Sequence, residues 1–340
     1  MATIADVARV AGVSIATVSR VLSPGAIPHP VRADTAERVR TAARDLNFVP
    51  SPLAQGLAAG RSGLIGLVVP DLADPHYPQI AGGVEEGARD ARLAVLICNT
   101  LGEQDRLTEY LSLLQARRVD AIVLSGGTSL NAVELLVLQA CRVPVVLIGR
   151  PIIHVPWPHV TIDNRSGARQ ATRHLVDAGA RRIVHLAGPR TQTTMADRAA
   201  AYREVVEATK LGADEVSSDG TPDDGYERLR ARLEDRSRPT PDGVFAATDR
   251  LAVAALAVAA DLHLHVPRDL AVIGFDDMPL AGQLRPTLSS MAQPAHELGQ
   301  TAIAMAQRLA AGENVQPAVL QARLVPREST LGPGGRYTSA

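Results

Sequence analysis

Cysteine and long apolar runs are scarce in this sequence of 340 residues, and each scarcity excludes a class of protein. The two cysteines, Cys98 and Cys141, lie far apart in apolar surroundings without metal or redox spacing, so we expect two reduced core thiols. No run approaches the ~18 apolar residues that a membrane span needs, so we expect no membrane partner. The first residues also lack the uninterrupted apolar segment of a signal peptide, which indicates a cytoplasmic protein.

Motifs of the common enzyme classes are missing as well. The apolar run LIGLVV (64–69) continues into PDLADPHYP, which has none of the glycines that let a backbone approach a pyrophosphate. There is no Ser/His/Asp order in an elbow context and no cluster with metal-ligand spacing. We therefore expect a protein that is not an enzyme and holds neither a cofactor nor a metal. Its length, with 46% hydrophobic and 21% charged residues, indicates two or three globular domains.

The net charge of −1 conceals an uneven distribution. Residues 1–61 contain seven arginines and four acidic residues, a net charge of +3, which leaves −4 for the remainder. A small basic N-terminal segment on a mildly acidic body is the electrostatic pattern of a protein that binds a polyanion.

Two short helices joined by a turn are predicted over residues 3–22. Thr3 can cap the first helix, Asp6 can complete a capping box, and Gly12 breaks the pattern where the turn lies. Ser14 can cap the second helix. Apolar residues follow each cap at the spacing of one buried helix face: Ile4, Val7, Ala8 and Ala11, and then Val18, Val21 and Leu22.

The second helix has only a narrow apolar face to bury, and it otherwise presents short side chains and one guanidinium group. Its outer face and N-terminal turn present Ser14, Ile15, Ala16, Thr17, Ser19 and Arg20. Such a face suits a helix that enters the major groove with its N-terminal end at the bases. Two amphipathic helices around a glycine also occur in domains that never touch DNA, so the helix pair alone leaves both readings open.

A third helix is predicted after the loop SPGAIPHPVRA, with Asp34 as its cap and an apolar face that contains Ala36, Val39, Ala43 and Leu46. Three short helices make a minimal bundle of about fifty residues. The following segment LAQGLAAGR (53–61) is too short for a stable isolated helix. It is either a plain linker or a segment that folds only when a partner holds it.

From residue 64 onward, short β-branched runs alternate with helical stretches of ten to fifteen residues. This alternation indicates βαβ units and parallel sheets covered on both faces. The pattern restarts after VTIDN (160–164), so the body has two Rossmann-like halves. The expected helices are Gln79–Arg92, Glu103–Ala116, Leu130–Cys141, Ser166–Ala178, Arg198–Thr209, Asp223–Asp235, Arg250–Ala260 and Ala295–Ala311, the last followed by one strand in VLQARLV.

The order of these parts resembles the lactose/galactose-repressor (LacI/GalR) family of bacterial transcription factors. The segments that carry the resemblance are TIADVARVAGVSIATVSRVL, AERVRTAARDLNFVPSPLAQGLAAG, IGLVVPDLADPHYPQIAGGVEE, TIDN, HLAGP, FAATD and LHVPRDLAVIGFDD. The resemblance implies an α/β fold with a three-helix helix-turn-helix head, a hinge helix, and a two-lobed periplasmic-binding-protein-like body with two parallel Rossmann-like sheets. The chain would cross between the lobes near Ile162–Asn164, Met291–Gln293 and Leu324–Pro326.

The same resemblance divides the chain into five parts. It implies a DNA-binding domain at 1–48, a hinge at 49–62, a first lobe at 63–162 with 293–323, a second lobe at 163–292 with 324–330, and a disordered tail at 331–340. The tail has no heptads, so we expect a homodimer rather than a tetramer.

Residues of the head and hinge take DNA-binding roles by this resemblance. Ile15, Ala16 and Arg20 match base readers, and Arg can make a bidentate contact to guanine, whereas Ile and Ala can read only by apolar contact. In the hinge, Ala54 joins the DNA-binding set, and Leu57 matches the leucine that wedges into the minor groove. Gln55 and Gly56 depart from the arginine and serine that are frequent there, and each weakens the hinge helix or its phosphate contacts.

Residues that follow the strands of the body take effector-binding roles. The resemblance assigns His76, Tyr77, Asp163, Gln192, Thr194, Arg198, Asp219, Thr248, Asp276 and Gln293. Arg198 and Asp276 would clamp ligand hydroxyls, since fixed donors opposite a carboxylate suit a polyol. Gly220 and Gln192 replace an aromatic and an arginine of the purine-binding member, which favours a sugar over a purine.

Together these features predict a repressor that binds operator DNA as a homodimer and whose operator affinity is controlled by a small polar effector, most simply a sugar. The alternative is a free-standing sugar-binding protein. The absence of a signal peptide and the basic N-terminal segment argue against that alternative.

Overall fold

The computed structural model describes residues 2–22, 31–48, 61–126, 136, 139–149, 152 and 155–332. The chain divides into two compact units, residues 1–64 with 118–120 and the remainder, and each is described by itself. The predicted hinge, with Ala54 and Leu57, lies outside the described residues apart from its last two positions, and so does the predicted tail beyond residue 332.

The head consists of α1 (Ile4–Ala11), α2 (Ile15–Leu22) and α3 (Ala33–Asp45). The predicted capping box of Thr3 and Asp6 is confirmed, and so is the turn at Gly12, whose φ of 63° lies in the left-handed region that glycine favours. The prediction for Asp34 is wrong: Arg32 precedes α3 without a side-chain cap, and Asp34 lies in the first turn. At this position the negative charge of Asp34 still interacts favourably with the positive end of the helix dipole.

A small core holds the three helices together. Its buried members are Val7, Ala8, Ala11, Val18, Val39, Ala42 and Ala43. All the predicted face residues of α1 and α2 lie in it or pack against it, so the helical spacing identified this core. The cluster is made of small side chains, which lets the helices approach closely.

The first lobe of the body contains a six-stranded sheet in the order β11-β5-β4-β3-β1-β2. The pairs β1–β3, β3–β4, β4–β5 and β5–β11 are parallel. The strands are β1 Leu64–Val69, β2 Ala94–Asn99, β3 Ala121–Ser125, β4 Val145–Ile148, β5 His159–Ile162 and β11 Ala318–Leu320. The predicted alternation of strands and helices is therefore confirmed for this lobe.

The second lobe contains another six-stranded sheet in the order β12-β10-β9-β8-β6-β7. Its strands are β6 Ile183–Ala187, β7 Asp214–Ser217, β8 Gly243–Ala246, β9 Ala271–Asp276, β10 Ser289–Ala292 and β12 Arg323–Val325. The edge strand β12 is antiparallel to β10, while the other four pairs are parallel. The sheet is thus parallel-dominated rather than wholly parallel, because the chain returns from the first lobe in the opposite direction.

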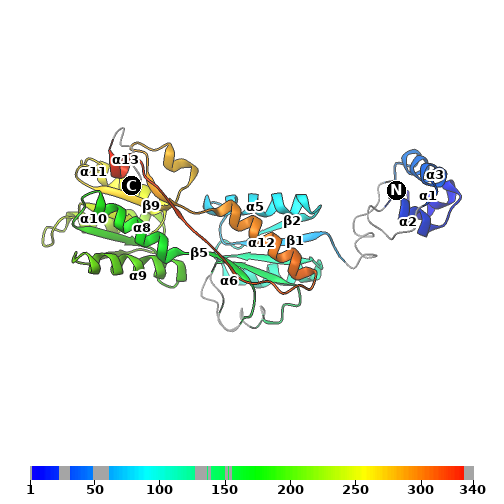
Figure 1. Cartoon of the computed structure of the whole chain (residues 1–340), viewed down its shortest axis with the longest axis horizontal. Helices are drawn as coiled ribbons and strands as arrows, with labels where there is room; N and C mark the ends of the chain where they lie inside the picture. Colours follow the sequence, from blue (N-terminus) through cyan, green and yellow to red (C-terminus); the bar gives the residue numbers. More distant parts are fainter. Residues whose placement is uncertain are drawn as a thin grey trace. The chain divides into compact units, whose positions relative to one another are not determined.

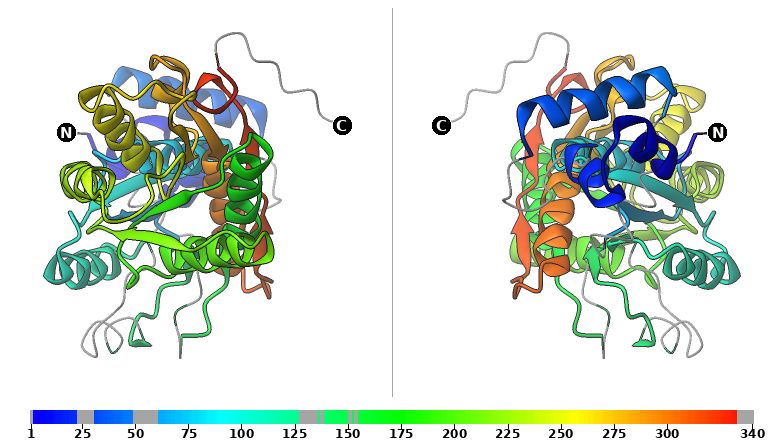
Figure 2. Two further views of the ribbon diagram at one scale, coloured as in Figure 1. Left: turned by 90° about the vertical axis from the view of Figure 1, so that its left-hand side faces the viewer. Right: turned by 90° about the vertical axis from the view of Figure 1, so that its right-hand side faces the viewer.

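Helices cover both faces of each sheet, as Figures 1 and 2 show. In the first lobe they are α5 His76–Asp90, α6 Gln104–Ala116 and α12 Ala295–Ala310. In the second lobe they are α8 Asn164–Asp177, α9 Thr193–Ala208, α10 Pro222–Glu234, α11 Asp249–Asp261 and α13 Glu328–Leu331, with a 3₁₀ turn at Pro279–Gly282. The side chains of α8 and α9 pack on one face of the second sheet, and those of α10 and α11 on the other.

Some predicted boundaries are wrong by several residues. Helix α5 begins at His76 rather than Gln79, and α9 begins at Thr193 rather than Arg198. In both cases a polar residue that was read as part of the preceding loop starts the helix. Most of the helix predicted at Leu130–Cys141 lies outside the described residues.

The chain crosses between the lobes three times. The first two crossings, after β5 and after β10, lie where they were predicted. The third is earlier than predicted, because VLQARLV forms two strands that belong to different sheets, β11 and β12, and only residues 321–322 lie between them. Figure 1 shows this last crossing as the red ribbon that runs from one lobe to the other.

Close packing of two helices fixes the start of α5, which carries part of the predicted effector site. A Cβ on Gly83 would lie 2.0 Å from the carbonyl oxygen of His296, and a Cβ on Gly299 would lie 2.2 Å from that of Ile80. Only glycine permits this approach, so α5 and α12 touch through their backbones. The N-terminal turn of α5 is thereby anchored to the first lobe.

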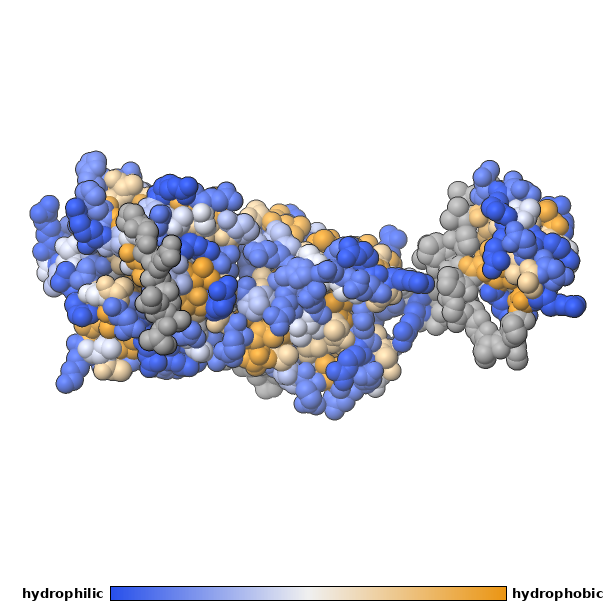
Figure 3. Space-filling view, turned by 45° about the horizontal axis from the view of Figure 1, so that its top comes forward, coloured by the Kyte–Doolittle hydropathy of each residue, from blue (hydrophilic) through white to orange (hydrophobic). Residues whose placement is uncertain are grey.

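The two cysteines and the surface agree in part with what the composition predicts. Cys98 is buried as predicted, whereas Cys141 is only half-buried, and neither forms a disulfide. Within the described residues no helix is long and apolar enough to cross a membrane. Figure 3 shows a mostly hydrophilic face on which hydrophobic residues form several separate patches.

Candidate functional site

The predicted base-reading residues lie on the outer face of α2. Ile15 is 52% exposed, and Ala16 and Arg20 are exposed as well. Arg20 donates from Nε to the carbonyl oxygen of Ala16 at 3.3 Å, which holds its guanidinium along the helix. An exposed isoleucine can contact a thymine methyl group, and an exposed arginine can donate to a guanine.

Interactions behind this face set the direction of α2. Ser14 accepts from the backbone N–H of Thr17 at 3.2 Å, so the predicted cap is confirmed, and Val18 is fully buried below. Arg38 of α3 donates from Nη2 to the carbonyl oxygen of Ala11 at 2.8 Å. That bond satisfies a carbonyl at the end of α1 and fixes the turn before α2. The head therefore presents Thr17, Ser19 and their exposed neighbours on a rigid support.

The predicted effector residues converge on a cavity of about 160 Å³ between the two lobes. Its wall contains eight of the ten residues assigned from the sequence: His76, Tyr77, Gln192, Thr194, Arg198, Thr248, Asp276 and Gln293. The cavity lies at the carboxyl ends of the strands in both sheets, where ligands of parallel α/β folds bind. Residues far apart in the chain thus form one polar site.

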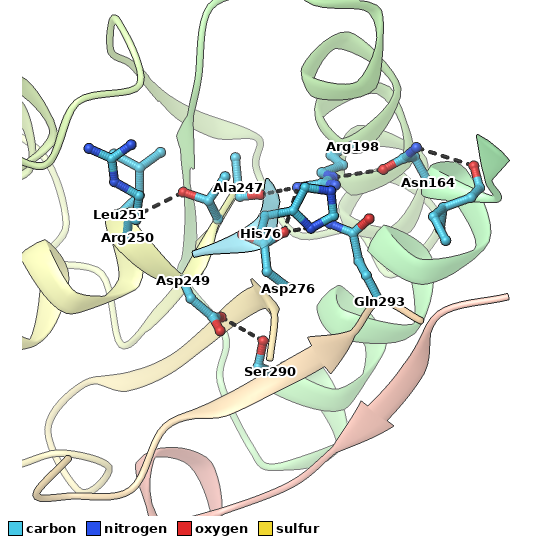
Figure 4. Close-up of polar contacts among 12 residues, drawn as sticks. His76, Asn164, Arg198, Ala247, Asp249, Arg250, Leu251, Asp276, Ser290 and Gln293 are labelled. Carbon is cyan, nitrogen blue, oxygen red and sulfur yellow. Dashed lines mark hydrogen bonds and ion pairs between the residues drawn. The ribbon is translucent and has the colours of Figure 1, made fainter. Parts of the chain in front are cut away.

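Arg198 of α9 is the centre of the polar network, as Figure 4 shows. It is only 3% exposed, and its guanidinium donates to the Asn164 side chain at 2.9 Å and to the Ala247 carbonyl at 2.5 Å. Its carbon Cζ lies 3.7 Å from the centre of the Phe275 ring, a cation–π contact. The side chain is therefore fixed before any ligand arrives.

Asp276 ends β9 beside Arg198. The distance between its Oδ1 and Nη1 of Arg198 is 3.7 Å, and the same oxygen accepts from Nε2 of Gln293 at 2.5 Å. Burial raises the pKa of Asp276 above its usual range, while the neighbouring Arg198 guanidinium opposes that rise and favours the carboxylate. The pair thus places an acceptor and fixed donors side by side, which suits a ligand hydroxyl.

The backbone of Asp276 is strained. Its φ is 127°, a conformation that non-glycine residues rarely adopt. Such strain persists only where the surrounding structure enforces it, and it concentrates at functional sites.

The first lobe contributes an aromatic wall. The rings of His76 and Tyr77 meet edge to face with centroids 5.4 Å apart. Burial lowers the pKa of His76 to about 4, so the imidazole is neutral at physiological pH and one nitrogen can accept a hydrogen bond. Burial also raises the pKa of Tyr77 above its usual range, which keeps its hydroxyl protonated.

Two of the assigned residues do not line the cavity. The Asp163 carboxylate accepts from the backbone N–H of Ser166 at 2.9 Å and caps α8. The Asp219 carboxylate accepts from the backbone N–H of Thr221 at 2.8 Å and from its hydroxyl at 2.6 Å, at the protein surface. Both follow strands, as ligand residues do, but local helix-start and turn contacts occupy them.

Several cavity residues escaped the sequence analysis. They include Asp74, Ser125, Asn164 and Met195. Asn164 follows Asp163 in TIDN, so the sequence located the crossover but not the residue of it that lines the cavity. Asp74 lies two residues before His76, and its sequence context signals only a loop.

A helix-turn-helix head on the same chain as a two-lobed body with a polar interlobe cavity defines a ligand-responsive DNA-binding regulator. Comparisons with known proteins agree. Residues 3–51 match the family model described as bacterial regulatory proteins, lacI family, and residues 172–330 match a periplasmic binding protein-like domain. The chain belongs to the lacI family of bacterial regulatory proteins, and it is a DNA-binding transcriptional regulator.

Three relatives illustrate the similarity. The chain is 35% identical to the ribose operon repressor of Halalkalibacterium halodurans over 98% of both chains. It is 31% identical to a structure of the transcriptional regulator CelR with cellobiose, over 97% of this chain and 100% of that one, with a TM-score of 0.72. It is 27% identical to the lac repressor dimer bound to operator and the anti-inducer ONPF, over 97% and 99%, with a TM-score of 0.86.

Proposed function

We propose that this protein is a repressor whose affinity for operator DNA is set by a small sugar bound between the lobes. One observation carries the proposal: the pre-organised Arg198–Asp276 pair borders a cavity built by both lobes, in the same chain as a helix-turn-helix head. A ligand there touches both lobes, so it can favour one lobe arrangement over another. Only such a differential affinity can change operator binding.

The chemistry of the cavity favours an uncharged polyol. Arg198 and Asp276 neutralise each other, and the remaining polar lining is made of hydroxyl, amide and imidazole groups together with Asp74. The volume of about 160 Å³ is below the ~300–1,000 Å³ of drug-sized ligand sites and suits a small ring. The relatives named for ribose and crystallised with cellobiose support a sugar.

A homodimer would use the edge of the first sheet. The edge strand β2 exposes Leu96 and Ile97, which are 37% and 51% accessible. An exposed apolar edge strand is a template for pairing with another chain. The related lac repressor was solved as a dimer on its operator. Two heads held together would read a roughly palindromic site, and the protein would act in the cytoplasm as a regulator rather than an enzyme.

A thermal-shift panel of sugars, nucleosides and amino acids, followed by operator binding, tests the proposal. A sugar that binds the native state should raise the melting temperature, and the same sugar should change the affinity for the upstream region of the protein's own gene. Stabilisation by nucleosides alone, or operator binding that no stabilising ligand affects, would refute the proposed function.

A further inference from the structure

Asp74 lines the cavity and also joins an ion pair across it. It lies in the loop between β1 and α5, two residues before His76. Its Oδ1 accepts from the backbone N–H of His76 at 3.0 Å, and its Oδ2 lies 3.5 Å from Nη1 of Arg250 in the second lobe. One oxygen is therefore held by each lobe.

Arg250 projects from a helix start that is itself fixed. Thr248 caps α11 by accepting from the backbone N–H of Leu251, and its side chain also lines the cavity. The adjacent Asp249 is completely buried, where it accepts from the Ser290 hydroxyl at 2.5 Å and from the Met278 backbone N–H at 2.7 Å. Arg250 thus has little freedom at its backbone, and Figure 4 shows it on α11 next to this network.

Figure 4 shows Arg250 on the opposite side of the network from Asn164 and Gln293, which lie at two of the crossings between the lobes. In the part of the chain that the structure describes, the other polar side-chain bonds around the cavity stay within one lobe or lie at a crossing, as those of Arg198 and Gln293 do. A rotation of one lobe against the other about the crossings would separate Asp74 from Arg250. Such a rotation would break the ion pair, so the pair favours the lobe arrangement described here.

We propose that Arg250 is a positioning residue of the effector site, which holds Asp74 at the cavity wall and stabilises the lobe arrangement described here through their interlobe ion pair. The inference rests on the proposed function, since it makes sugar affinity depend on closure. The side chains of Arg250 and Asp74 are 35% and 24% exposed, so salt screens the pair. An uncharged sugar should then bind more weakly as salt rises, although it carries no charge of its own.

Calorimetric titration of the full chain with D-ribose and with cellobiose, at low and high salt, tests the inference. Arg250→Gln should weaken sugar binding by about two- to fivefold and abolish its salt dependence, and Arg250→Lys should restore part of both. Asp74→Asn, which keeps an acceptor for the His76 N–H, should match Arg250→Gln. The double variant should bind no more weakly than either single variant, because the two residues act as one unit.

Arg308→Gln is the matched control, because Arg308 forms an exposed ion pair with Glu313 at 2.7 Å within the first lobe. It should leave sugar affinity and its salt dependence unchanged. The inference is overturned if Arg250→Gln binds sugar like the wild type, or if the losses from Asp74→Asn and Arg250→Gln multiply in the double variant.

A sugar-free measurement separates this inference from the proposed function. Spin labels at Glu109→Cys in the first lobe and Glu227→Cys in the second, in a Cys141→Ser background, report the interlobe distance. Arg250→Gln should broaden that distance distribution, and Arg308→Gln should not. If neither sugar binds the wild type, the proposed sugar effector fails, and an unchanged distribution in Arg250→Gln would independently refute the ion-pair role.

Discussion

The head and the body hold their functional side chains in opposite states. On α2 the predicted base readers Ile15, Ala16 and Arg20 face solvent with few partners. In the cavity Arg198 is almost inaccessible, and an amide, a carbonyl and an aromatic ring hold it in place. The exposed side chains of the head thus need a large partner to supply their contacts. The cavity is pre-organised, so its side chains lose little entropy when a small ligand binds.

This difference determines how substitutions should act. An exposed reader can be truncated without disturbing the fold, so its loss should appear only in DNA binding. A buried polar residue supports its neighbours, so its loss should affect stability and ligand binding together.

Breaking the dimer should have the largest effect, because it removes the link between two heads. Ile97→Asp places a charge on the apolar edge strand β2, where a partner chain would bury it. We expect monomers and a loss of operator affinity of ~10²–10⁴-fold, the usual gain from linking two binding modules. Sedimentation and operator titration measure both effects.

Val319→Asp provides the control for Ile97→Asp. Val319 is a similarly exposed apolar residue on β11, at the opposite edge of the same sheet. The Val319→Asp variant should remain dimeric. If Val319→Asp is monomeric and Ile97→Asp is dimeric, the dimer interface lies at the β11 edge instead.

Truncating the buried arginine should cost stability. Arg198→Ala removes the charged partner of Asp276 and the side-chain donor to Asn164, and breaking a buried charge pair typically costs ~3–5 kcal/mol. Denaturant unfolding should show this loss. Arg169→Ala, which removes an exposed partner of Glu204 on the neighbouring helix, should change the free energy of unfolding by less than ~1 kcal/mol. Equal effects would mean that Arg198 is not part of a buried network.

The contrast between head and body also explains what could be read from the sequence. In the head, capping and helical spacing act between residues three or four positions apart, so Thr3, Ser14 and the core face of α1 were found directly. The alternation of strands and helices likewise fixed both sheets. The predicted single strand in VLQARLV proved to be two, β11 and the antiparallel β12, because strands of three residues carry too little periodicity to show where one ends and the next begins.

The polar network of the cavity could be predicted only through the family resemblance, and then incompletely. The partners of Arg198 are Asn164 and the Ala247 carbonyl, 34 and 49 positions away in the chain. Contacts between residues so far apart in the sequence leave no local sequence pattern. Asp163 and Asp219 were predicted to bind the effector because they follow strands. A position after a strand does not reveal whether a carboxylate lines the cavity or instead caps a helix or a turn, as these two do.

Truncating an exposed reader should have a smaller and purely DNA-dependent effect. Arg20→Ala should cost ~1–3 kcal/mol per half-site and relax the preference for one guanine, with non-specific binding largely retained. Arg40→Ala, on the exposed face of α3, should leave sequence preference unchanged. An equal loss on operator and random DNA for Arg20→Ala would show that Arg20 contacts only phosphate.

The last prediction concerns pH, and its effect should vanish near neutral pH, where the imidazole is neutral in both the folded and the unfolded chain. Burial lowers the pKa of His76 to about 4, below its ordinary 6.5, so the unfolded chain binds more protons than the folded one between these values. The free energy of unfolding should therefore rise as pH increases from 4 to 6.5, and it should rise less for the His76→Gln variant. Melting temperatures across this range, with the exposed His263→Asn as control, provide the measurement. Identical pH profiles for His76→Gln and the wild type would place His76 in water rather than in a buried wall.

The central claim is that a ligand beside Arg198 controls DNA binding by the head. Its most direct test is operator affinity measured by fluorescence anisotropy, with and without the sugar that stabilises the wild type, for the wild type and Arg198→Ala. We predict that the sugar changes the wild-type affinity by ~5–150-fold, the usual range of allosteric coupling, and that the folded variant binds operator like the sugar-free wild type and does not respond. A variant that responds fully at the sugar concentrations sufficient for the wild type would contradict the account and place the effector site elsewhere.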